Sequence, residues 1–145
     1  MLKMSSSEKI SKFPSDLRLE IQVSSSINAS EDPSKVLDVI NLIIGEVGIE
    51  YRKYGNNLVI GKSNNYKVLN SIYEQVRNRS VISVLRRLLL FHLQENVTWF
   101  YVNKQAATKG IIVLVDNEEE SPLGPIKISI KSENILNVIG WLCPE

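Results

Sequence analysis

Val97-Thr98-Trp99-Phe100-Tyr101-Val102 runs directly into Asn103-Lys104-Gln105-Ala106-Ala107, and this stretch decides the fold class. Its first part is rich in β-branched and aromatic residues, which is typical of a strand. Its second part is a polar elbow, followed by a second apolar run from Ile111 to Val115. A turn with Pro122, Gly124 and Pro125 then leads into a third strand, Ile126 to Ile130. Strands joined by short turns predict an antiparallel sheet.

The N-terminal half alternates strand and helix signals. A half-buried strand is predicted by alternating apolar residues at Leu17, Leu19, Ile21 and Val23. Asp32 and Pro33 mark a helix start, and the buried stripe of that helix is Val36, Ile40, Ile43 and Val47. Two further strands, Ile49 to Tyr54 and Leu58 to Gly61, flank a hairpin turn at Gly55-Asn56-Asn57.

Three more helices complete the pattern. We expect one from Leu69 to Val76, a break at Asn78 to Ser80, and a second from Val81 to Gln94 that is the most buried. The last helix follows Ser132-Glu133, with its inward residues at Ile135, Leu136, Ile139 and Leu142. The order β-α-β-β-α-α-β-β-β-α predicts an α+β two-layer sandwich, with a largely antiparallel sheet and helices on one face. Residues 1–15 are expected to form a flexible N-terminal tail, and residues 16–145 a single domain.

Composition excludes several functions. The 145 residues are 43% hydrophobic and 23% charged, with a net charge of +1, so the bulk charge indicates no polyanion partner. The single cysteine, Cys143, excludes an internal disulfide and suits a reducing compartment. The sequence contains no apolar run of membrane-spanning length and no signal peptide. We therefore expect a cytoplasmic protein with no metal, no cofactor and no membrane contact.

The polar elbow is the first candidate site. Asn103, Lys104 and Gln105 combine a cation with two amides, which suits contacts to RNA phosphates or base edges. Alternatively, the amides satisfy backbone groups at a strand end, and the elbow is structural.

Basic residues around the helix break form the second candidate site. Arg77, Arg79, Arg86 and Arg87 cluster by sequence, and Lys104 and Lys109 would extend the patch if the fold brings them close. Solvated helix faces with internal ion pairs would give the same pattern. A weaker basic group surrounds the first hairpin at Arg52, Lys53 and Lys62.

Aromatic residues and the lone histidine come next. In a strand, Trp99 and Tyr101 face one side and Phe100 the other. On an open sheet face such rings can stack on unpaired bases; alternatively, one set is core and the other packs at a dimer interface or under the tail. His92 lies in an apolar helical stripe without a partner histidine or cysteine, which predicts a buried, hydrogen-bonded side chain. Asp116 and Glu118 to Glu120 lack metal-ligand spacing and predict a solvated loop.

Three motifs allow a comparison with a known family: Phe100-Tyr101-Val102-Asn103-Lys104-Gln105-Ala106-Ala107, Glu120-Ser121-Pro122-Leu123-Gly124-Pro125-Ile126, and Val138-Ile139-Gly140-Trp141-Leu142-Cys143-Pro144. Together they closely resemble an uncharacterised archaeal family regarded as RNA-binding. The resemblance implies a fold like that of large-subunit ribosomal protein L-five, a similarity to double-stranded-RNA-binding folds, and association with exosome or ribosome components. The chain departs from this family in its Ser/Lys-rich tail and its less basic middle helices.

Two functions follow from these observations. The first is a non-catalytic RNA-binding protein that contacts phosphates through a local basic surface. The alternative is a protein-interaction or self-assembling dimeric scaffold that uses the aromatic residues of an exposed sheet face. We expect no enzyme, because the sequence offers no nucleophile–base pair, no phosphate-cradling glycine loop and no metal cluster.

Overall fold

A six-stranded sheet in the order β2-β3-β1-β6-β4-β5 forms the centre of the protein, and every neighbouring pair is antiparallel. The computed structural model describes residue 13 and residues 17–44, 50–54, 58–120 and 123–145, without the side chains of 44 and 50–54. The strands are β1 (Glu20–Ser26), β2 (Glu50–Tyr54), β3 (Leu58–Ser63), β4 (Val97–Val102), β5 (Leu114–Val115) and β6 (Ile126–Lys131).

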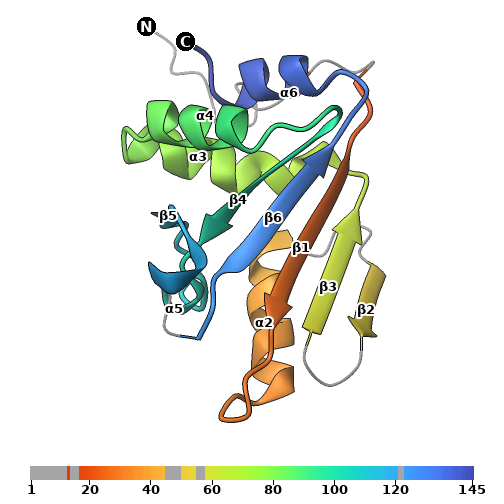
Figure 1. The fold of residues 1–145 in the computed structure, drawn as a ribbon, viewed down its shortest axis with the longest axis vertical. Helices are drawn as coiled ribbons and strands as arrows, with labels where there is room; N and C mark the ends of the chain where they lie inside the picture. The colour runs from red at the N-terminus through yellow and green to blue at the C-terminus, as the bar shows by residue number, and fades with distance from the viewer. Residues whose placement is uncertain (1–12, 14–16, 45–49, 55–57, 121–122) are drawn as a thin grey trace, which may run out of the picture.

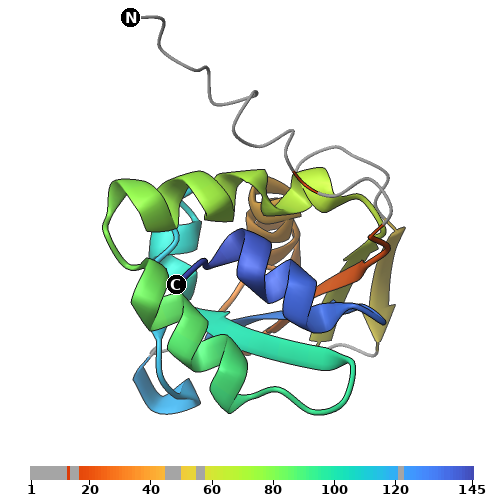
Figure 2. The same cartoon turned by 90° about the horizontal axis from the view of Figure 1, so that it is seen from above.

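Helices make up the second layer. They are α2 (Pro33–Ile44), α3 (Asn70–Asn78), α4 (Ile82–Phe91), the short α5 (Lys104–Ala107) and α6 (Ile135–Leu142), with 3-10 turns η1 (Tyr66–Leu69) and η2 (Glu118–Glu120). Figure 1 shows α2 behind the sheet and α3, α4 and α6 together at one end. The view from above in Figure 2 shows these three helices over that end of the strands. The predicted α+β sandwich is confirmed.

Strand alternation builds the core. Each long strand turns every second side chain toward the helices, including Ile21, Val23, Phe100, Val102, Ile126, Ile128 and Ile130, all of them buried. Helix residues at 3.6-residue spacing meet them, among them Ile40, Ile72, Leu85, Leu89 and Leu142. Phe100 is fully buried, so its predicted separation from Trp99 and Tyr101 is confirmed.

The elbow after β4 is a helical turn. The Asn103 side chain accepts a hydrogen bond from the backbone N–H of Ala106 at 2.9 Å and so caps α5. The following strand is shorter than the expected Ile111 to Val115, because its first backbone groups bond elsewhere. Ile111 N–H donates to the Ala106 carbonyl, and Ile112 N–H donates to Gln75 Oε1 at 2.7 Å.

Helix α4 is less buried than predicted. Leu85, Leu88 and Leu89 face inward, but Leu90 is 41% exposed and Phe91 is 80% exposed. The helix also ends at Phe91 rather than Gln94. Its wide apolar stripe therefore extends beyond the face that the core covers.

Helix α6 corrects one inward assignment. Ile135, Val138, Ile139 and Leu142 are buried, whereas Leu136 is 63% exposed. The buried set follows i, i+3, i+4, i+7 spacing, which places position 136 on the outer side. Ser132 precedes the helix, and its hydroxyl accepts from Asn134 N–H and donates to the Arg18 carbonyl.

Phe13 lies within the segment expected to be a tail, yet it packs on the domain. Its side chain is 5% exposed and stacks on Tyr66 with a ring separation of 4.5 Å, while Trp141 contacts it edge-on at 4.8 Å. The packed region therefore includes residue 13. The rest of the predicted tail, the hairpin turn at 55–57 and Val47 lie outside the described residues.

Candidate functional site

One side of the sheet is free of described helices. Figure 1 shows no helix crossing the front of β1, β3 and β6. We call this side the open face, and it presents the outward residues Gln22, Ser24, Lys62, Trp99, Tyr101, Lys127, Ser129 and Lys131. Small polar residues, lysines and aromatic rings share this face with Glu20, the cross-strand neighbour of Lys131, and Ile60, the cross-strand neighbour of Ser24.

Strand register brings these residues into two rows. The first row runs from Trp99 to Ser129, Gln22 and Lys62 across four strands. The second row places Tyr101 beside Lys127 and Ser24. Neighbouring strands are about 4.8 Å apart, so side chains within a row are close neighbours.

Four aromatic side chains form a continuous line on this side, which we call the aromatic row: Phe91, His92, Trp99 and Tyr101. The rings of Phe91 and His92 meet edge-on at 5.1 Å, and His92 stacks on Trp99 at 3.5 Å with an interplanar angle of 18°. Trp99 and Tyr101 follow at 4.9 Å. With Phe91 largely exposed at its end, the row offers ring surface to a ligand.

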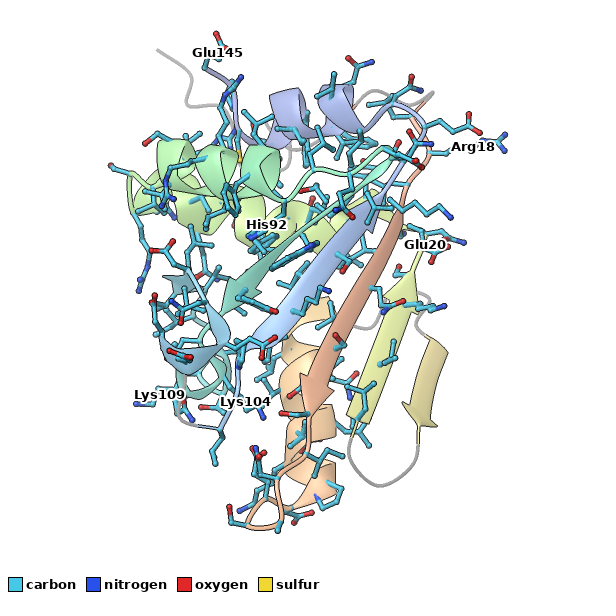
Figure 3. The ribbon with its side chains drawn as sticks, viewed as in Figure 1. Arg18, Glu20, His92, Lys104, Lys109 and Glu145 are labelled. Atoms are coloured by element: carbon cyan, nitrogen blue, oxygen red, sulfur yellow. The ribbon has the colours of Figure 1, made fainter. Side chains whose placement is uncertain are left out.

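His92 holds the row to the end of α4. Its Nδ1 lies 3.0 Å from the carbonyl oxygen of Trp99. Since a carbonyl only accepts, Nδ1 carries the hydrogen and Nε2 is left for other partners. The predicted hydrogen bond is confirmed, although the ring is half-buried rather than buried (Figure 3).

Lys127 lies over the ring of Trp99, with its ammonium 4.7 Å from the ring centroid. His92 already occupies one face of this indole at stacking distance. The ammonium is therefore on the opposite face, where it makes a cation–π contact. Among the described residues, Lys62, Lys127 and Lys131 form no ion pair with a carboxylate.

Tyr101 is held in its neutral form. Its hydroxyl donates to Glu118 Oε1 at 2.8 Å. Burial, followed by this hydrogen bond and the Glu118 charge, raises the pKa of Tyr101 to about 12. Tyr101 is therefore an uncharged ring of the open face, and the positive charge of that face comes from its lysines.

Lys104 does not fit its expected role as a phosphate contact. The residue is 3% exposed, and its ammonium donates to the carbonyls of Ser26 at 3.0 Å and Leu123 at 2.9 Å. It also pairs with Glu31 Oε1 at 3.1 Å. We call this arrangement the lysine clasp. A buried ammonium with three internal partners is not available to a ligand, so the structural alternative for this part of the elbow fits better.

Glu31 is adapted to the clasp. Burial opposes its ionisation, but hydrogen bonds from Asn28 and Lys104, together with the Lys104 charge, lower its pKa overall. Asn28 donates to Glu31 Oε1 from its backbone at 3.0 Å and from its side chain at 2.8 Å. The carboxylate is therefore charged and fully engaged when the protein is folded.

Two of the motifs that carry the family resemblance meet at the clasp. The Leu123 carbonyl of the second motif accepts from Lys104 of the first motif and from the Asn28 side chain. Gly124 adopts φ +82°, and a Cβ there would lie 2.9 Å from Ser26 Oγ. These motif residues position the chain and leave the open face to other residues.

The predicted arginine cluster is divided among internal partners. Arg77 donates to the carbonyls of Tyr73 and Leu142, Arg86 pairs with Glu145 at 2.7 Å, and Arg87 pairs with Asp116 at 3.3 Å. Arg79 is exposed, as are Lys109 and Gln105 near the elbow.

Arg86 lies apart from Lys104 and Lys109. Figure 3 shows Lys104 and Lys109 in the lower half of the molecule and Glu145, the partner of Arg86, at its top. In the weaker basic group, Lys62 joins the open face, while the side chains of Arg52 and Lys53 lie outside the described residues.

Two lysines of the open face, Lys127 and Lys131, were not singled out from the sequence. Lys127 and Lys131 alternate with buried isoleucines along β6, so the two-residue period already indicated an outward row. Their place beside Trp99 and Tyr101 depends on the pairing of β6 with β4, which the sequence does not specify.

No group of three or more His, Cys, Asp or Glu residues within the described ranges is placed to hold a metal ion. Over the same ranges, the helices are too short or too polar to span a bilayer.

Comparison with known proteins adds independent findings. Residues 20–132 match a family model described as RNA binding. A UPF0201 protein of Sulfurisphaera tokodaii is 34% identical over 120 residues, covering 82% of this chain and 83% of that protein. A UPF0201 protein of Methanothermobacter thermautotrophicus is 32% identical over 126 residues, covering 87% and 92%.

Solved structures agree in fold. A crystal structure of an uncharacterised UPF0201 protein superposes with a TM-score of 0.71 at 25% identity, covering 87% of this chain and 94% of that one. The UPF0201 protein from Methanococcus jannaschii gives a TM-score of 0.71 at 24% identity, covering 87% and 93%.

Proposed function

This chain belongs to the archaeal UPF0201 family, whose model is described as RNA binding, and from that membership we propose that it binds RNA at the open face. The proposal replaces the basic patch expected around the elbow and the helix break. It is supported above all by one observation, the aromatic row lying beside lysines that have no described ion-pair partner.

Stacking energies favour a base over the present neighbour of Trp99. An exposed cation–π contact contributes about 0.5–1 kcal/mol. Stacking of a base on an aromatic side chain contributes about 1–3 kcal/mol. A base can therefore displace the ammonium of Lys127 from the indole, and the freed ammonium is then close to the phosphate of the same nucleotide.

The lysines supply the electrostatic part of binding. Lys62, Lys127 and Lys131 are spread over two strands of the open face, and none of them is committed to a described carboxylate. Three phosphate contacts on a single strand predict a slope of log affinity against log salt of roughly −2. This modest dependence suits a protein with a net charge of +1.

Filter-binding titrations with single-stranded RNA test this proposal. Trp99→Leu should weaken binding by about 5- to 150-fold, which corresponds to the loss of one stacked base. Lys127→Ala should weaken binding and reduce the magnitude of the salt slope by about 0.7. Lys109→Ala is the matched control, because Lys109 is exposed but lies outside the open face.

Two results would contradict the proposed site. One is unchanged affinity in both Trp99→Leu and Lys127→Ala. The other is a loss of affinity in Lys109→Ala that exceeds the loss in Lys127→Ala, which would return the site to the elbow.

A self-assembling scaffold is the second candidate function. Leu90, Phe91 and Leu136 are 41%, 80% and 63% exposed, and they lie on α4 and α6. Sedimentation velocity tests it: a dimer that persists at high salt and dissociates in Phe91→Ser would favour this function. Association with exosome or ribosome components, the absence of catalysis and a cytoplasmic location stay predictions.

A further inference from the structure

A pocket of about 650 Å³ lies at one end of the open face. Its walls come from the start of β1, Asn64 after β3, the end of β6 and the loop before α6, and its polar lining includes Arg18, Glu20, Lys131, Glu133 and Asn134. The labelled Arg18 and Glu20 mark this corner of the molecule in Figure 3. Ligand pockets typically measure about 300–1,000 Å³, so a nucleobase with its sugar fits.

The charges of the pocket balance. Arg18 and Lys131 are opposed by Glu20 and Glu133, so the wall has two positive and two negative side chains. A polyphosphate would meet repulsion from the carboxylates. A neutral ligand with several donors and acceptors suits this wall better, and the edges of a nucleobase have that chemistry.

Two side-chain amides in the wall are free to bind. Asn134 stands at the start of α6 without making the capping hydrogen bond common at that position. Asn64 and Asn134 are both exposed, so their side-chain amides are open to a ligand. Each amide can donate and accept at once, as recognition of a base edge requires.

The pocket continues the surface that holds the aromatic row. Lys131 follows Ser129 by two residues on β6, and Ser129 is the cross-strand neighbour of Trp99. Two residues of a strand span about 7 Å, so the pocket mouth is one extended nucleotide away from the Trp99 ring.

We propose that this pocket receives one unpaired nucleobase of an RNA strand that stacks on the aromatic row. The inference rests on the proposed function and narrows it, since a base that enters a pocket cannot be paired within a duplex. The ligand class is therefore single-stranded RNA, read by base edges at one position.

A double-mutant cycle that combines changes in the protein with changes in the RNA tests the inference. Short single-stranded RNA oligonucleotides, intact or with one abasic nucleotide moved along the strand, are titrated against wild type and the double variant Asn64→Ala/Asn134→Ala. Wild type should lose about tenfold in affinity at one abasic position, the value of one or two base-edge hydrogen bonds. The double variant should bind the same abasic RNA and the intact RNA equally well.

Asn78→Ala is the control, because Asn78 is exposed at the end of α3 and away from the pocket. It should retain the wild-type abasic penalty. An unchanged abasic penalty in the double variant, together with weaker binding by Trp99→Leu, overturns the pocket and leaves the proposed function standing. Absence of RNA binding by wild type overturns both.

Discussion

Replacing Lys104 with methionine should destabilise the protein strongly while leaving its RNA affinity unchanged. Methionine keeps most of the apolar stem but removes the ammonium of the lysine clasp. Glu31, with a side chain only 11% exposed, then loses its cationic partner. The carbonyls of Ser26 and Leu123 lose a donor at the same time.

The size of the effect follows from burial. Removing one partner of a buried ion pair costs about 3–5 kcal/mol. Two hydrogen bonds from Asn28 continue to support the Glu31 carboxylate, so the lower end of that range applies. For a chain of this length, a loss of about 3 kcal/mol lowers the midpoint of thermal unfolding by roughly 6–12 °C.

Urea unfolding followed by far-ultraviolet circular dichroism measures the loss. Lys104→Met, Glu31→Gln and the double variant form a cycle, and the double variant should lose less stability than the sum of the single variants. A loss below about 1 kcal/mol in Lys104→Met would refute the clasp as a buried ion pair, since exposed pairs have that value. A folded Lys104→Met protein with much weaker RNA binding would refute the assignment of Lys104 to structure.

Three further predictions concern backbone strain and pH. Gly124→Ala should destabilise by about 1–3 kcal/mol in urea titrations, because φ is +82° and the new Cβ would meet Ser26 Oγ, whereas Gly140→Ala, in open space on α6, should stabilise by about 0.5–1 kcal/mol. Because the pKa of Glu31 is lowered on folding, its contribution to stability is present above pH 4.5 and is lost as the pH falls through the pKa of the folded state. The urea midpoint of Glu31→Gln should therefore fall less steeply with decreasing pH than that of the wild type. The pKa of Tyr101 is raised from 10.0 to about 12, so its contribution is present below pH 10 and is lost as the pH rises toward 12, and Tyr101→Phe should remove that part of the alkaline destabilisation.

Local periodicity explains why the fold was predictable. The alternation through Ile21, Val23 and the isoleucines of β6 assigns each side chain to one face, whichever strand becomes its neighbour. Asp32 and Pro33 likewise start α2 where expected, with Asp32 Oδ1 accepting from Ser34 N–H at 3.0 Å.

The site was less predictable because it depends on contacts between distant parts of the chain. The local sequence predicts that Lys104 is a surface cation in an elbow, but its carboxylate partner, Glu31, is 73 residues away in sequence. Phe91 belongs to a helical stripe wide enough to face either the core or solvent, and only the packed helix decides between them. The position of the β6 lysines beside the aromatic row depends on the pairing of β6 with β4.

The two tryptophans occupy different surroundings, which has a practical consequence for spectroscopy. Trp99 lies between His92 and Lys127 on the open face, whereas Trp141 packs in α6 against Phe13 and Tyr73. Their intrinsic emission therefore reports separate events, the proposed stacking of a ligand for the first indole and the docking of residue 13 for the second. A Trp141→Phe protein would allow RNA titrations to be followed without a label, and Trp99→Phe would isolate the signal from Trp141.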